Sequence, residues 1–164
     1  MLFSESFLET VSGDLLMTFL VAMAPVVELR GAIPAGIASG LPPALACIAA
    51  IAGNLVPAPF IIVLGRRIAN WLRGTRFFGP KIIWLERRAH LKGRLVRKYR
   101  LLGLAILVGI PLPGTGAWTG SLAAAFLGMR LKKAMPAVVL GVLTAGCIML
   151  GLTHMGINLF SGAI

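Results

Sequence analysis

Three long stretches of this 164-residue chain contain no charged residue: residues 31–65, 101–129 and 134–164. Each is longer than the roughly 20 apolar residues that an α-helix needs to cross a bilayer. The composition agrees, since 58% of the residues are hydrophobic, 13% are charged, and the mean hydropathy is +0.92. Soluble domains contain about 25% charged residues. The sequence therefore predicts an all-α integral membrane protein formed by a single membrane domain, residues 1–164.

Positive charge is concentrated in residues 66–100, which hold twelve of the 16 Lys and Arg residues but only one acid, Glu86. Lys and Arg accumulate in cytoplasmic segments of membrane proteins, so this segment is predicted to be cytoplasmic. Anionic lipid headgroups are a better partner for it than nucleic acid, because apolar segments flank it on both sides. Its apolar residues fall roughly on one helical face, which predicts an amphipathic helix lying in the membrane interface. A solvated connector is the alternative. The predicted headgroup contacts are Arg87, Arg88, Lys92, Arg94, Arg97 and Lys98.

Proline and glycine interrupt the first apolar region at residues 24–40, which read A-P-V-V-E-L-R-G-A-I-P-A-G-I-A-S-G. Proline lacks a backbone donor and glycine relaxes the backbone, so a helix is expected to break there. The arm before Glu28 is too short to span a bilayer. Irregular backbone at membrane depth is tolerated only where protein or water covers it. We therefore expect a re-entrant hairpin over residues 15–41, followed by a full span over residues 44–65.

The second half repeats this design, with an apolar arm, the break G-I-P-L-P-G-T-G at residues 109–116, and a second apolar arm. Basic residues flank both ends of residues 101–128, and a hairpin places both flanks in the cytoplasm as the charge rule requires. Residues 134–154 then form the second span. The two halves, residues 15–65 and 101–154, are predicted to form an inverted-topology repeat in a multi-pass cell-membrane protein, with both termini outside. Gly31-Ala32 matches Gly116-Ala117 at an offset of 85.

Two hairpins entering from opposite faces would bring helix ends together near the bilayer middle, where such ends bind ions or charged groups. Glu28 is the only acid between Asp14 and Glu86, so coupling through an intramembrane carboxylate must use it. The alternative role is a structural ion pair with Arg30. Arg30 itself suits a phosphate or carboxylate ligand. The complete predicted substrate or ion site is Glu28, Arg30, Gly31, Asn54, Pro111, Pro113, Gly114, Thr115, Gly116, Trp118 and Thr119.

Catalytic machinery has no signature in this sequence. It shows no nucleophile beside a base, no paired carboxylates and no metal-ligand spacing, so we expect no enzyme, no cofactor and no metal site. Cys47 and Cys147 lie within apolar segments and are predicted to be small core residues rather than a disulfide.

The motifs P-V-V-E-L-R-G-A-I-P-A-G, G-N-L-V-P-A-P and G-I-P-L-P-G-T-G-A-W-T-G resemble those of the putative small multi-drug export protein family of bacteria and archaea. The resemblance covers about residues 20–155 and implies a small exporter. That family is similar in turn to the DedA, or VTT-domain, superfamily, which is associated with paired re-entrant hairpins, lipid scrambling and recycling of polyprenyl-phosphate carriers. Glu28, Gly65-Arg66 and Pro113-Gly114 match its pattern, but Ile110 and Gly116 stand where its arginines flank the Pro-Gly pair.

Three functions are consistent with these features. The leading one is a small transporter, ion- or proton-coupled and homodimeric, that binds an amphiphilic or anionic substrate where the hairpins meet. The second is a flippase or scramblase for polyprenyl-phosphate or phospholipid. The third is a non-transporting membrane adaptor whose basic segment recruits an acidic partner.

Overall fold

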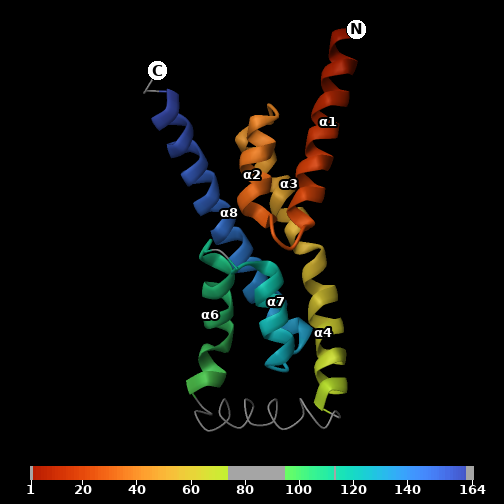
Figure 1. Ribbon diagram of the computed structural model, residues 1–164, viewed down its shortest axis with the longest axis vertical. Coiled ribbons are helices and arrows are strands. Elements are labelled where there is room, and N and C mark those ends of the chain that lie inside the picture. The colour runs from red at the N-terminus through yellow and green to blue at the C-terminus, as the bar shows by residue number, and fades with distance from the viewer. Residues whose placement is uncertain (1, 74–94, 113, 162–164) are drawn as a thin grey trace.

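The computed structural model describes residues 2–73, 95–112 and 114–161, and no strand occurs in these ranges (Figure 1). The predicted all-α class is therefore confirmed. The helices are α1 (Leu2–Met23), α2 (Glu28–Ala38), α3 (Pro43–Leu55), α4 (Pro57–Arg73), α6 (Leu95–Gly109), α7 (Ala117–Phe126) and α8 (Leu131–Ser161).

Two helical stretches are long and apolar enough to cross a membrane: Pro43–Ile68 and Leu131–Gly156. Each has 26 residues and contains an 18-residue segment with a mean hydropathy of 2.2. The first comprises α3 and most of α4, which meet at Val56, because Pro57 cannot donate the backbone hydrogen bond that would continue α3. These stretches contain the two spans predicted from the sequence, residues 44–65 and 134–154.

The first break is shorter than the sequence suggests. α1 begins at Leu2 rather than near residue 15, and the irregular backbone is confined to residues 24–27. Helix resumes at Glu28, so Arg30 and Gly31 are helical. Pro34 lies inside α2 without ending it, since one proline removes only one backbone hydrogen bond. The expected break across residues 24–40 was therefore wrong in extent.

Two antiparallel helix pairs, α1 with α2 and α6 with α7, approach each other from opposite ends of the molecule (Figure 1). α1 packs on α2 and α3, while α6 packs on α7 and α8. The α1–α2 turn and the α6–α7 loop both lie near the middle of the long axis. Both chain termini lie at one end, and the end of α4 and the start of α6 lie at the other. We call residues 24–28 the first tip and residues 110–116 the second tip.

Small residues let these helices approach closely. A Cβ on Gly53 of α3 would meet the carbonyl oxygen of Phe19 in α1, and a Cβ on Gly141 of α8 would lie 2.8 Å from the carbonyl oxygen of Ala105 in α6. Close backbone approach at glycine is typical of membrane helices, where apolar side chains gain nothing by leaving lipid. Large side chains such as Phe60, 70% exposed, face outward instead.

The basic segment is described only at its ends. Residues 66–73 complete α4, and residues 95–100 begin α6, so the expected boundary between the basic segment and the next apolar arm falls inside one helix. Arg87, Arg88, Lys92 and Arg94 lie outside the described residues. Arg97 and Lys98 belong to the first turn of α6. The headgroup contacts predicted for all six residues, and the predicted interfacial helix, therefore stay predictions.

Candidate functional site

Glu28 in the first tip caps the N-terminus of α7. Its Oε1 accepts a hydrogen bond from the backbone N–H of Trp118, the second residue of α7, at 3.2 Å. The N-cap residue of α7 is Gly116, which has no side chain to do this. A carboxylate at this position pairs an amide that the helix leaves unpaired and also complements the positive end of the helix dipole. Glu28, at the start of α2, thus supplies the hydrogen-bond acceptor that a residue next to α7 normally supplies.

The backbone around this contact is adapted to it. Glu28 is 6% exposed and has φ of 46°, a left-handed conformation that costs a non-glycine residue about 1–3 kcal/mol. Gly116 has φ of 153°, and a Cβ there would meet the Glu28 carboxylate, lying 2.6 Å from Cδ and 2.8 Å from Oε1. Glycine at position 116 is therefore required both by the backbone angle and by the carboxylate that lies against it.

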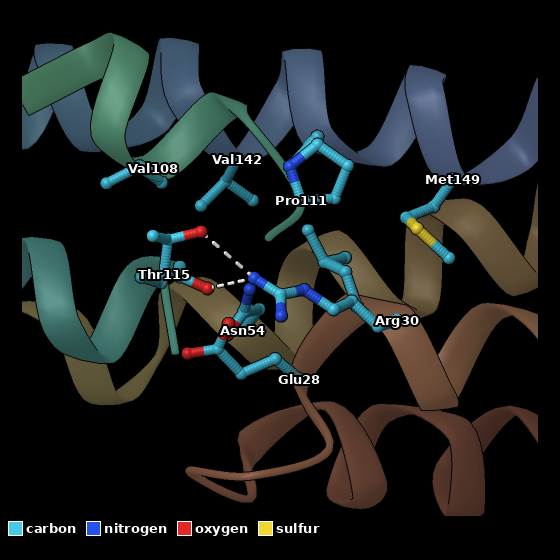
Figure 2. Close-up of a pocket in the computed structure, with 12 residues that line it drawn as sticks. Glu28, Arg30, Asn54, Val108, Pro111, Thr115, Val142 and Met149 are labelled. Carbon is cyan, nitrogen blue, oxygen red and sulfur yellow. Dashed lines mark hydrogen bonds between the residues drawn. The ribbon is translucent and has the colours of Figure 1, made fainter. Parts of the chain in front are cut away.

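Arg30 holds the second tip. Its Nη2 donates to the carbonyl oxygen of Thr115 and, at 3.1 Å, to the Thr115 hydroxyl (Figure 2). The same hydroxyl donates to the carbonyl oxygen of Ile110 at 2.8 Å and to that of Leu112 at 2.9 Å, so it fastens the loop onto itself. Among the described residues no ion pair joins Glu28 to Arg30. Arg30 instead binds the backbone of the second tip at Thr115, and Glu28 binds the backbone of α7 at Trp118.

Trp118 makes the reciprocal contact. Its indole Nε1 donates to the carbonyl oxygen of Met23 at 3.1 Å, and Met23 is the last residue of α1. The last carbonyls of a helix lack partners within the helix, so this bond caps the C-terminus of α1. The start of α7 is consequently tied to the end of α1 by the Trp118 indole and to the start of α2 by the Glu28 carboxylate.

A small cavity lies where the tips meet, with a volume of about 10 Å³, room for about one water molecule. Asn54 of α3 lines it, is 1% exposed, and has an Oδ1 without a hydrogen-bond partner among the described residues. Figure 2 shows Asn54 beside Glu28 and Arg30. A buried amide oxygen without a partner costs free energy, so it marks a place where a donor or cation can bind. We call this the tip cavity. It is lined by Glu28, Leu29, Arg30, Asn54, Val108, Pro111, Thr115, Gly116, Ala117, Val142, Ala145 and Met149.

The predicted site residues divide into three groups. Six line the tip cavity: Glu28, Arg30, Asn54, Pro111, Thr115 and Gly116. Four lie beside it. Trp118 makes the two caps, and Thr119 donates from its hydroxyl to the carbonyl oxygen of Gly114 at 2.8 Å. Gly31 instead lies against the Val27 side chain within its own turn. Pro113 is outside the described residues.

Sequence reasoning missed the apolar wall of the cavity. Val142, Ala145 and Met149 line it from α8. Their spacing of three and four residues places them on one face of a helix, which is the signal that could have found them. That signal also fits ordinary core packing, so it becomes informative only once α8 is known to pass the tips.

A family model described as "Putative small multi-drug export protein" matches residues 28–148. This range contains every lining residue of the tip cavity except Met149. No curated protein and no solved structure matches the chain, and the further similarity to the DedA superfamily stays a prediction. Because the matched range covers well over half of the sequence, the chain belongs to the putative small multi-drug export protein family.

Proposed function

We propose that this protein is an ion-coupled membrane exporter in which substrate passes between the two tips. Glu28 acts as the protonatable coupling group, and Arg30 binds an anionic part of the substrate. The observation that carries the proposal is the crossed pair of caps, in which Glu28 holds the start of α7 and Trp118 holds the end of α1. These contacts close the route between the tips, and any passage of substrate has to break them.

Each helix pair is proposed to be a re-entrant hairpin. The apolar parts of the first arms, Thr10–Met23 and Tyr99–Gly109, are shorter than a span requires. Both tips lie near the middle of the molecule, between the two helices that are long enough to cross (Figure 1). Glu28 and Gly116 are buried in these tips, whereas Val26 is 90% exposed and Leu112 55% exposed. Irregular backbone at membrane depth has to be covered, so this arrangement requires water or a second protein surface at the exposed part of each tip.

Equivalent backbone features support an inverted repeat. α1 ends at Met23 and α6 at Gly109, 86 residues later, while α3 begins at Pro43 and α8 at Leu131, 88 residues later. A positive-φ glycine follows each of α2 and α7 two residues after its last residue, with φ of 104° at Gly40 and 63° at Gly128, again 88 residues apart.

The hydrogen bonds at these helix ends correspond one by one. Leu41 N–H donates to the carbonyl oxygen of Gly36, and Met129 N–H to that of Ala124, each donor and acceptor being displaced by 88 residues. Gly53 and Gly141 are also 88 residues apart, and each packs on the first arm of its own half. These features favour offsets of 86 before the break and 88 after it, rather than the 85 read from Gly31-Ala32. By the helix bounds, the second break, residues 110–116, is three residues longer than the first, residues 24–27.

The proposed transport step follows from the contacts that close the tips. A proton or cation on Glu28 removes the negative charge that caps α7, which frees the first amides of that helix. An anionic group of the substrate can then bind these amides and Arg30, and the tips separate. Loss of the proton lets Glu28 return to its cap and expel the substrate. Proton and substrate are thus bound in the same state and released together, so the coupling is co-transport.

Glu28→Gln tests this step in proteoliposomes with an imposed pH gradient. Gln retains an oxygen that can accept from Trp118 N–H but cannot cycle between charged and neutral forms, so we expect a folded protein without proton-driven efflux. Asp14→Asn is the matched control, because it removes the other acid nearest in sequence without touching the tip cavity. Full efflux by the Gln variant would remove Glu28 from the mechanism.

The flippase alternative rests on Arg30, because a guanidinium beside free amides also suits a lipid phosphate. Measuring headgroup accessibility of labelled lipid in the same proteoliposomes separates the two functions. Lipid flipping that is lost in Arg30→Gln, together with absent solute efflux in the unmodified protein, would favour the flippase. The homodimer stays a prediction.

A further inference from the structure

A second, larger cavity lies away from the tips, where α6 begins and α7 gives way to α8. Its volume is about 360 Å³, and it is lined by Arg100, Leu101, Gly128, Met129, Arg130 and Lys133. We call it the basic cavity, because three of its six lining residues are cationic and, among the described residues, no acid lines it. Like charges gathered around an open space repel one another unless an anion lies between them.

Two further features favour an anion here. The Nε of Arg100 is buried and has no partner among the described residues, so this guanidinium retains an unused donor. Arg130 and Lys133 flank the start of α8 at Leu131, where the helix dipole adds positive potential. Guanidinium and ammonium groups at such a place bind phosphate well.

An apolar groove adjoins the basic cavity. Its volume is about 330 Å³, and it is lined by Tyr99, Arg100, Gly103, Leu104, Leu107, Ala123 and Leu127, so Arg100 belongs to both. From Tyr99 to Leu107 the groove follows α6 for about 12 Å, estimated from the rise per residue. The other wall is α7. The pair of spaces therefore matches an amphiphile with an anionic head and a hydrocarbon tail.

We propose that these two spaces together bind one anionic phospholipid, with its phosphate in the basic cavity and one acyl chain in the groove. The apolar half distinguishes this ligand from a free phosphate ion, which would use only the basic residues. The lipid comes from the leaflet on the side of the basic segment, which the charge rule assigns to the cytoplasm. The residues differ from those predicted to contact headgroups in residues 87–98. The bound lipid joins α6, α7 and α8, and so fixes the hairpin that carries the second tip.

The test is retention of phosphatidylglycerol by the full chain. The protein is reconstituted in phosphatidylcholine vesicles that contain a minor fraction of phosphatidylglycerol, then extracted, purified and analysed for bound lipid by native mass spectrometry. We expect Arg130→Gln and Lys133→Gln each to weaken phosphatidylglycerol binding about five-fold, the usual contribution of one basic residue at an anionic membrane surface. Lys132→Gln is the matched control, since Lys132 is an exposed neighbour that does not line the cavity.

The groove is tested separately by Gly103→Leu. A Cβ at Gly103 meets no atom within 4 Å, so the new side chain fills the groove without straining the fold. We expect Gly103→Leu to retain less phosphatidylglycerol. Gly151→Leu is the control, because Gly151 lies on α8 and a Cβ there also meets no atom within 4 Å, so this variant should retain as much lipid as the unmodified protein. Equal losses with Lys132→Gln and Lys133→Gln would overturn the proposal. So would unchanged retention in Gly103→Leu, or displacement of the lipid by inorganic phosphate alone.

Discussion

Substituting Gly116 tests whether the Glu28 carboxylate truly determines the geometry of the tips. In Gly116→Ala the new Cβ would lie 2.6 Å from Glu28 Cδ, so the carboxylate has to withdraw and lose its bond to Trp118 N–H. A charged hydrogen bond is worth about 1.5–3 kcal/mol. Alanine at φ of 153° adds strain of about 1–3 kcal/mol. The free energy of unfolding should therefore fall by about 2.5–6 kcal/mol, measured by titrating detergent-solubilised protein with a denaturing detergent.

A double-mutant cycle separates the two contributions. In a Glu28→Ala background the carboxylate is absent, so Gly116→Ala should cost only the backbone strain of about 1–3 kcal/mol. Gly114→Ala is the matched control: Gly114 has φ of 84°, but its Cβ would meet nothing within 4 Å. It should cost the same with or without Glu28. If Gly116→Ala costs the same in both backgrounds, the carboxylate does not shape the tip, and the proposed cap is wrong.

Two further substitutions probe the cavity and the packing. Asn54→Leu removes the amide oxygen that lacks a partner, so the free energy of unfolding should stay level or rise by about 1 kcal/mol while transport falls. Parallel denaturation and efflux measurements check this. Unchanged efflux would exclude Asn54 from the pathway. Gly53→Ala introduces a Cβ against the carbonyl oxygen of Phe19 and should destabilise by about 1–3 kcal/mol. Gly13→Ala, an open helical position in α1, should instead stabilise by about 0.5–1 kcal/mol; equal effects at both glycines would contradict the proposed α1–α3 contact.

Most of what the sequence could predict came from the length of its uncharged apolar runs. The runs that contain residues 44–65 and 134–154 are too apolar for anything except long buried or membrane helices, and helices occupy both. Six of the predicted site residues line one cavity. The sequence could single them out because each is a polar, glycine or proline residue in an apolar setting, which distinguishes it from its neighbours.

The exact helix boundaries followed from contacts that the sequence does not show. Glu28 begins a helix at a positive φ, which no residue preference favours, and contacts with the opposite tip hold it there. α1 begins at Leu2, well before the apolar pattern that places the start of the hairpin near residue 15. Val142 belongs to the cavity only because α8 passes the tips, and valine is equally common in any core.

If the two halves form the proposed inverted repeat, the differences between them indicate where chemistry can occur. At the offset of 88, Asn54 corresponds to Val142, and both line the tip cavity. The first half therefore contributes a polar side chain where the second contributes an apolar one. The same division holds around the tips: the first half supplies the charged side chains Glu28 and Arg30, and the second half supplies the backbone groups of Trp118 and Thr115 that these side chains bind. Glycine at 116 leaves those groups accessible, and a residue with a side chain there would cover them. This division is what the proposed transport step requires: with charged side chains on one helix pair and their backbone partners on the other, a change of charge on Glu28 would change how strongly the two pairs hold together.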